Sequence, residues 1–310
     1  MITAAQVPLA PRTLDLILTA AKPLLPIPVL LLVLPALWWL FRNTWRELDD
    51  DAAAWRARLA AEGKRDMRPF VALSMCAVVL TLQEYYGSRS YYSDVIHPWL
   101  VTLAVKHPHT IRLPKYDDLY NFGWWAASRI GGYLFPLAVW KVFFREDSLL
   151  DMGFRLRGFF HHLWIYLLFL VVVVPLVFFI SRQPDFSSYY PFYKESSRSW
   201  FDFLAWEAMY FVQFFALEVF FRGFWLAALR RSFGSGAIFA MAVPYCMIHY
   251  TKPFLEANAA IVAGVALGSL SMKTKSIYQG FLVHITVAGL MDWLVLSHGH
   301  ALPKVFWAPG

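Results

Sequence analysis

The sequence predicts an all-α protein, a polytopic bundle of about eight transmembrane helices. Hydrophobic residues make up 59% of its 310 residues and charged residues only 16%, whereas a soluble domain carries about 25% charged residues. Aromatic residues reach 18%, and the mean hydropathy is +0.47. This composition excludes a disordered chain and an ordinary soluble enzyme.

Eight apolar segments supply the predicted spans, and most approach the roughly 20 residues that a membrane crossing needs. They are residues 22–42, 67–85, 123–144, 158–181, 200–229, 234–250, 255–271 and 276–297. Lys and Arg are denser in the connections after the first, third, fifth and seventh segments than elsewhere. The positive-inside rule therefore places these connections in the cytoplasm and both termini outside, as expected for a multi-pass protein of a bacterial-style cytoplasmic membrane.

The net charge and the number of cysteines limit which partners and which kinds of scaffold fit this chain. A net charge of +7 is explained by loops that face anionic lipid, so we expect the bilayer and no nucleic acid as a partner. Two cysteines exclude a disulfide scaffold. The longest polar connections, 86–122 and 182–199, are predicted to be loops.

Charged residues within the fifth segment are the first sign of a functional site. A charge at mid-bilayer costs about 2.5–3.5 kcal/mol on insertion scales, so such residues are paired or face a polar cavity. Glu218 and Arg222 are four residues apart and share one helix face. Glu207 lies about three turns earlier, near the same face. A purely structural ion pair between Glu218 and Arg222 is the alternative interpretation.

Two histidines strengthen the functional interpretation. His249 ends the sixth segment, four residues after Tyr245, and His284 lies inside the eighth. Their depths and that of Glu218 agree within roughly 10 Å at a rise of about 1.5 Å per residue. We therefore expect one polar cavity, where a carboxylate and a histidine could activate water.

These residues resemble the motifs of the CAAX protease and bacteriocin-processing family, which consists of glutamate-dependent intramembrane proteases. Glu218, Arg222 and the glycine after it resemble the family's Glu-Glu-x-x-x-Arg-Gly segment. Tyr245 to His249 is similar to its Phe-x-x-x-His motif, and the segment that ends at His284 is similar to its last motif helix. The resemblance covers about residues 150–297.

The resemblance implies an intramembrane endopeptidase that hydrolyses a peptide bond in a membrane-embedded or lipid-anchored polypeptide. It implies catalytic roles for Glu218, His249, His284 and Arg222. Supporting roles fall to Tyr245, Asp292, Glu256 and Glu207. The chain then divides into N-terminal helices and loops without a recognised motif, 1–149, and a protease-like core, 150–300.

Two positions depart from the family pattern and leave other functions open. Leu217 occupies the position of the usual catalytic glutamate, and Ala288 occupies that of an asparagine or aspartate. Asp292, one turn further on, is placed to reach the edge of the cavity. A catalytically inactive scaffold or immunity-type protein on the same fold is the main alternative, and a transporter is a weaker one.

A metal ion is a further alternative for the same side chains. Glu218, His249 and His284 would suit zinc, because two histidines and one carboxylate form a known catalytic ligand set. The resemblance favours a metal-free glutamate mechanism, and we therefore expect no cofactor.

Overall fold

The computed structural model describes residues 16, 20–24 and 26–308. The chain divides into two compact units, residues 1–42 and 43–310. The first contains η1 (Lys22–Leu24) and the beginning of α2 (Pro26–Ala61). The second contains the rest of α2, all later helices and every predicted site residue. The predicted boundary near residue 150 remains a prediction.

The second unit is built from helices. Its longer helices are α3 (Arg68–Tyr86), α6 (Leu113–Phe143), α8 (Leu163–Ile180), α10 (Trp200–Glu218), α11 (Leu226–Phe233), α12 (Gly236–Met247), α13 (Phe254–Thr274) and α14 (Tyr278–His298). Shorter helical pieces are α4 (Arg89–Tyr91), η2 (Tyr92–Ile96), α5 (His97–Lys106), η3 (Leu149–Met152), α7 (Arg157–His161), α9 (Pro184–Tyr189), η4 (Lys194–Ser197) and η5 (Val219–Trp225).

The predicted helical membrane bundle is confirmed, with fewer clear spans than expected. Among the described residues, 6 helices are long and apolar enough to cross a membrane. They are Pro26–Ala61, Arg68–Tyr86, Leu163–Ile180, Trp200–Phe233, Phe254–Thr274 and Tyr278–His298. The predicted segment 123–144 lies in α6, which is long enough but too polar. The segment 234–250 forms a helix of only 12 residues, α12, followed by a turn.

The connection 86–122, predicted as a loop, is largely helical. It contains α4, the π-helix η2 and α5, and α6 begins at Leu113. Both α5 and α6 begin with proline in their first turn, where the missing N–H has no helical partner to lose. Hydropathy alone assigned these short helices to a loop because they are too polar for a span.

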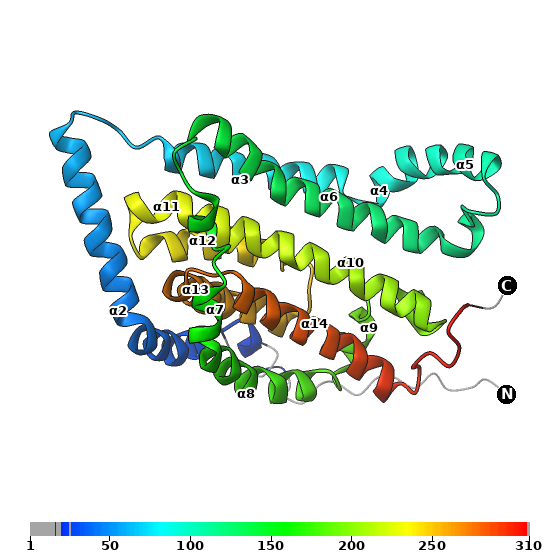
Figure 1. Cartoon of the computed structure of the whole chain (residues 1–310). Helices are drawn as coiled ribbons and strands as arrows, with labels where there is room; N and C mark the ends of the chain where they lie inside the picture. The colour runs from blue at the N-terminus through cyan, green and yellow to red at the C-terminus, as the bar shows by residue number, and fades with distance from the viewer. Residues whose placement is uncertain (1–15, 17–19, 25, 309–310) are drawn as a thin grey trace. The chain divides into compact units, whose positions relative to one another are not determined.

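Within the second unit, the helix that carries Glu218 is central. The α10 helix packs against α6 on one side and α14 on the other, while α12 packs against α13 (Figure 1). In the most apolar window of Trp200–Phe233, 83% of the residues are buried, against 11% for Leu163–Ile180. Polar side chains on α10 are therefore enclosed by other helices.

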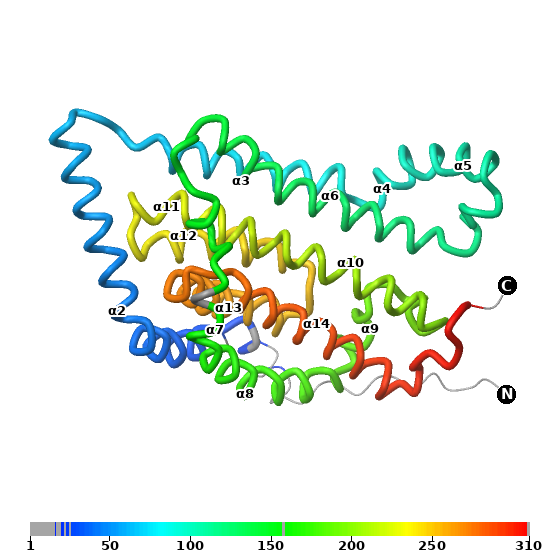
Figure 2. Tube along the Cα trace, in the orientation of Figure 1, coloured from blue at the N-terminus to red at the C-terminus, as the bar shows by residue number. Residues whose placement is uncertain are grey.

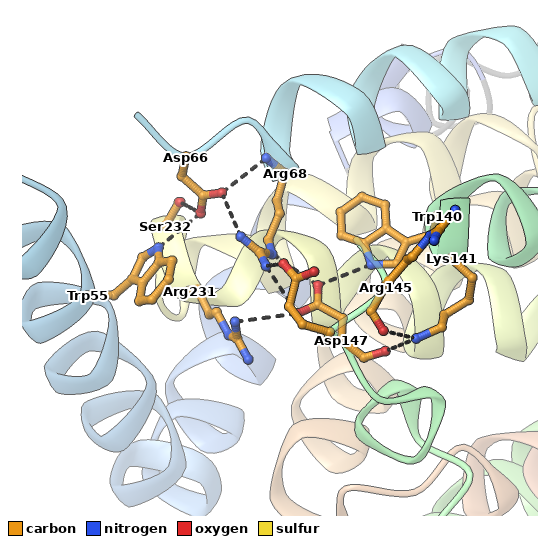
Figure 3. Close-up of polar contacts among 10 residues, drawn as sticks. Trp55, Asp66, Arg68, Trp140, Lys141, Arg145, Asp147, Arg231 and Ser232 are labelled. Atoms are coloured by element: carbon orange, nitrogen blue, oxygen red, sulfur yellow. Dashed lines mark hydrogen bonds and ion pairs between the residues drawn. The ribbon is translucent and has the colours of Figure 1, made fainter. Parts of the chain in front are cut away.

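The connections rich in basic residues meet at one end of this unit. Arg68, at the start of α3, donates hydrogen bonds to Asp147 after α6, and Arg231 of α11 lies 3.6 Å from Asp147 (Figure 3). The segment after α6 also pairs with the segment after α13, through an isolated bridge between Phe154 and Ser276. The course of both segments can be followed in Figure 2. The positive-inside rule predicts that the basic connections lie at one end of the bundle, as they do here.

Candidate active site

The site begins where α10 changes into a π-helix. Glu218 is the last residue of α10, and Arg222 lies in the π-helix η5. Single π-helical turns inside α-helices are rare and occur often at functional sites. The side chains of both residues have 0% exposure, and Arg222 Nη1 lies 3.1 Å from Glu218 Oε1. Two opposite charges are thus enclosed together in the interior of the bundle.

The α14 helix approaches Glu218 through a glycine. A Cβ atom at Gly280 would collide with Glu218 Oε2 and would lie 2.9 Å from Glu218 Cδ. One turn further along α14, His284 Nδ1 lies 2.9 Å from Glu218 Oε1. The absence of a side chain at position 280 therefore permits the contact between the carboxylate and the imidazole.

The surroundings of His284 define its protonation pattern. Its Nδ1 forms a 3.2 Å hydrogen bond with the carbonyl oxygen of Gly280. A carbonyl can only accept, so Nδ1 carries the proton of this bond. In the neutral ring, Nε2 then accepts from the Tyr245 hydroxyl at 2.9 Å. Phe214 stacks on the imidazole, with ring centroids 5.0 Å apart, and fixes its plane.

Arg222 joins Glu218 to Tyr245. Its guanidinium carbon lies 3.8 Å from the centroid of the Tyr245 ring, a close cation–π contact. Among the described residues, the nitrogens of Arg222 and both Glu218 oxygens find no partner with hydrogen-bond geometry, although their ion-pair distances are short. The carboxylate therefore keeps lone pairs that can accept a proton, which is the property required of a general base.

The described side-chain contacts of His249 are with Tyr245. It lies in the turn after α12, where its Nδ1 is 2.8 Å from the carbonyl oxygen of Tyr245. Its ring centroid lies 4.8 Å from that of Tyr245. The described contacts thus place His284 directly beside Glu218, and His249 behind Tyr245.

The supporting residues, apart from Tyr245, belong to other clusters. Asp292 Oδ2 accepts a 2.7 Å hydrogen bond from Trp206 Nε1, and Glu207 is its neighbour near the start of α10. Glu256 accepts hydrogen bonds from the Tyr190 hydroxyl and from Lys252. The described contacts therefore do not join these three carboxyl groups to Glu218.

The two departures from the motifs lie in packed surroundings. Leu217 and Ala288 are each 4% exposed, so neither position offers a polar group to the site.

Among the described residues, no three His, Cys, Asp or Glu side chains gather as a metal ion requires. The zinc set of Glu218, His249 and His284 is therefore not assembled in the described part of the chain.

Sequence reasoning missed two features of this site. The role of Gly280 was overlooked, although a glycine one turn before His284 signals close approach of a neighbouring helix. The π-helix η5 was also missed, because a helix with one extra residue per turn has no distinctive residue pattern. Both features determine where Glu218 and Arg222 point.

The structure thus encloses a carboxylate between an arginine and a histidine, inside helices that are long and apolar enough to cross a membrane. Residues 199–290 match the family described as type II CAAX prenyl endopeptidase Rce1-like. This match confirms the resemblance that the motifs indicated and supports a CAAX-type protease function in a multi-pass membrane protein. No curated protein and no solved structure matches the chain.

Proposed function

We propose that this chain is an intramembrane endopeptidase in which Glu218 activates the attacking water. The observation that carries the proposal is the contact of one buried carboxylate with both Arg222 and His284. All three residues lie in the segment that matches the CAAX endopeptidase family. Arg222 orients the Glu218 carboxylate through the contact of its Nη1 with Oε1 at 3.1 Å.

The proposed reaction uses the described groups in sequence. Glu218 takes a proton from water while the water oxygen bonds to the carbonyl carbon of the substrate. The carbonyl oxygen becomes an oxyanion, which a nearby hydrogen-bond donor must stabilise. The C–N bond then breaks as the leaving nitrogen receives a proton from Glu218, assisted by His284. Tyr245 holds His284 in the required tautomer through its hydroxyl group.

The proposed substrate is a membrane-embedded or lipid-anchored polypeptide. Glu218 lies inside Trp200–Phe233, one of the helices that can cross a membrane. A peptide bond reaches that depth most readily in a chain that is itself held in the bilayer. We further propose that the basic end of the bundle faces the cytoplasm.

Replacement of Glu218 by glutamine tests the proposal. Membrane-protein termini are compared in a strain that lacks this protein and in strains rescued with wild type, Glu218→Gln or Glu207→Gln at matched expression. We expect new termini with wild type and Glu207→Gln, and a loss of at least about a hundredfold in their abundance with Glu218→Gln. Glu207→Gln is the matched control because Glu207 is buried on the same helix, outside the contacts of Glu218.

The main alternative predicts a different result. If Leu217 and Ala288 mark a catalytically inactive scaffold, the Glu218→Gln protein still rescues any phenotype that wild type rescues. Identical termini in all four strains, together with rescue by Glu218→Gln, would replace the peptidase proposal with the scaffold function.

A further inference from the structure

A basic cavity lies beside the candidate active site, on the far side of Arg222. It has a volume of about 110 Å³ and opens at the end of the bundle where the basic connections meet. Its lining includes Asp151 and Arg155 after α6, Arg230 of α11, and Ser271 and Lys275 at the end of α13. Arg222 also lines it. Segments that are distant in the sequence therefore build one enclosure.

The charges around this cavity are not balanced. Arg155 pairs with Asp151 at 2.6 Å, and Arg222 lies beside Glu218. In the part of the chain that the structure describes, Arg230 and Lys275 have no carboxylate within ion-pair distance. The cavity thus carries two cationic side chains in excess, which favours an anionic ligand.

The position of Arg222 supports a ligand independently of this charge balance. Its side chain has 0% exposure, and its nitrogens have no hydrogen-bond partner among the described residues. The Glu218 carboxylate approaches only Nη1 of Arg222, at 3.1 Å, so an oxyanion in the cavity could pair with the remaining donors of this buried guanidinium. Arginine presents a planar fork of donors that fits the oxygens of a phosphate.

We propose that this cavity binds the phosphate group of an anionic phospholipid. Exposed apolar side chains lie before and after the lining residues Asp151 and Arg155 in the sequence, and they offer a surface for acyl chains. They are Leu149, Leu150, Leu156 and Phe160. Basic pockets between transmembrane helices on the cytoplasmic side are typical sites for anionic head groups. Since Arg222 faces both the cavity and Glu218, the bound lipid sits one side chain from the candidate catalytic carboxylate.

Lipid binding to the purified full-length protein tests this proposal without any need for peptidase activity. Native mass spectrometry counts the lipids retained after titration with phosphatidylglycerol or phosphatidylcholine in detergent. We expect preferential retention of phosphatidylglycerol by wild type. Arg230→Gln and Lys275→Gln should each lower its apparent affinity about fivefold, the effect of one basic side chain near an anionic lipid.

Arg145→Gln is the matched control, because it removes one positive charge from an exposed side chain at the same end, outside the cavity. Lys275 is exposed, so its replacement carries little risk to folding if Arg230→Gln proves unstable. Equal affinity of wild type and both cavity variants for phosphatidylglycerol would overturn the proposal. An equal loss in the Arg145→Gln control would overturn it too, since the attraction would then be unspecific.

Two competitors separate the lipid from other anions. Inorganic phosphate that displaces phosphatidylglycerol at equal concentration would show a site for a small free anion and overturn the lipid assignment. A short peptide that displaces the lipid only when its carboxyl terminus is free would show a site for a polypeptide end. Retention of the lipid against both competitors is the result that we expect.

Discussion

Two arginine–carboxylate pairs lie in different parts of this molecule. Arg222 and Glu218 lie inside the bundle, and Arg68 and Asp147 lie at its basic end (Figure 3). Each arginine also contacts an aromatic ring, at 3.8 Å from Tyr245 for Arg222 and 4.9 Å from Phe144 for Arg68. The two pairs therefore share their residue types and differ in what surrounds the carboxylate.

The carboxylate of Asp147 is saturated by its neighbours. It accepts two hydrogen bonds from Arg68, at 3.0 and 3.1 Å, and one from Trp140 Nε1 at 3.2 Å. Glu218 has no hydrogen-bond partner of good geometry among the described residues, although Arg222 and His284 lie close to it. The saturated pair is suited to holding three helices together, while the unsaturated carboxylate is available for proton transfer.

The largest expected effect comes from closing the space beside Glu218. Gly280→Ala places a methyl group against that carboxylate, and a displacement of about 1 Å at a catalytic group can lower a rate about a hundredfold. We expect at least that loss of cleavage, measured with a substrate found from the terminal comparison. Gly131→Ala is the control, since no other described atom lies within 4 Å of its Cβ position. Wild-type cleavage by Gly280→Ala would contradict the site.

Breaking the saturated pair should lower stability instead of cleavage. Arg68→Gln removes the charged donor of two hydrogen bonds to Asp147, and we expect a loss of about 2–3 kcal/mol in unfolding free energy. Chemical unfolding in detergent measures it. Arg58→Gln, which breaks an exposed pair with Glu62, should leave the unfolding free energy nearly unchanged. If Arg68→Gln lowered the cleavage rate per folded molecule, the Arg68–Asp147 pair would not be purely structural, and the proposed difference between the two pairs would be wrong.

A smaller effect is expected from the hydroxyl group of Tyr245. Tyr245→Phe keeps the ring beneath Arg222 but removes the hydrogen bond to His284 Nε2. Loss of one such bond is worth about 1 kcal/mol, so cleavage should fall about fivefold to tenfold with little change in unfolding. Tyr133→Phe, a buried tyrosine on α6, is the control. Unchanged cleavage by Tyr245→Phe would remove Tyr245 from the site.

The smallest effect concerns pH. Burial alone would raise the pKa of Asp147, but the hydrogen bonds and charge of Arg68 and the charge of Arg231 hold this pKa below its usual value. A carboxyl group with a lowered pKa stabilises the fold above its unfolded pKa of about 3.9. That stability is lost as pH falls through the folded pKa. The free energy of unfolding, measured from pH 6 to pH 3, should fall less for Asp147→Asn than for wild type.

The helical bundle was largely predictable because hydropathy reports burial in lipid directly. The segments 158–181 and 276–297 correspond to helices with closely similar bounds, Leu163–Ile180 and Tyr278–His298. The prediction was wrong about the loop at 86–122, because short polar helices at a membrane surface lack the apolar length by which spans are found. It also extended the sixth span through a turn that contains His249.

The candidate site was predictable where spacing along one helix determines contact. Glu218 and Arg222 do meet, as their four-residue separation indicated. Glu207 was placed near the same face, but eleven residues correspond to about 16 Å along a helix. Its neighbour is instead Asp292, on another helix. Contacts between helices, such as that of His284 with Glu218, depend on packing that one sequence does not reveal.

The π-helix η5 has a consequence for how relatives of this chain should be aligned. One extra residue within a helical turn advances everything after it by about 100° of helical phase. A single-residue deletion between Val219 and Trp225 would rotate α11 away from its present packing face while leaving α10 in place. Homologous chains that lack the π-helical turn should therefore show a one-residue gap between Val219 and Trp225.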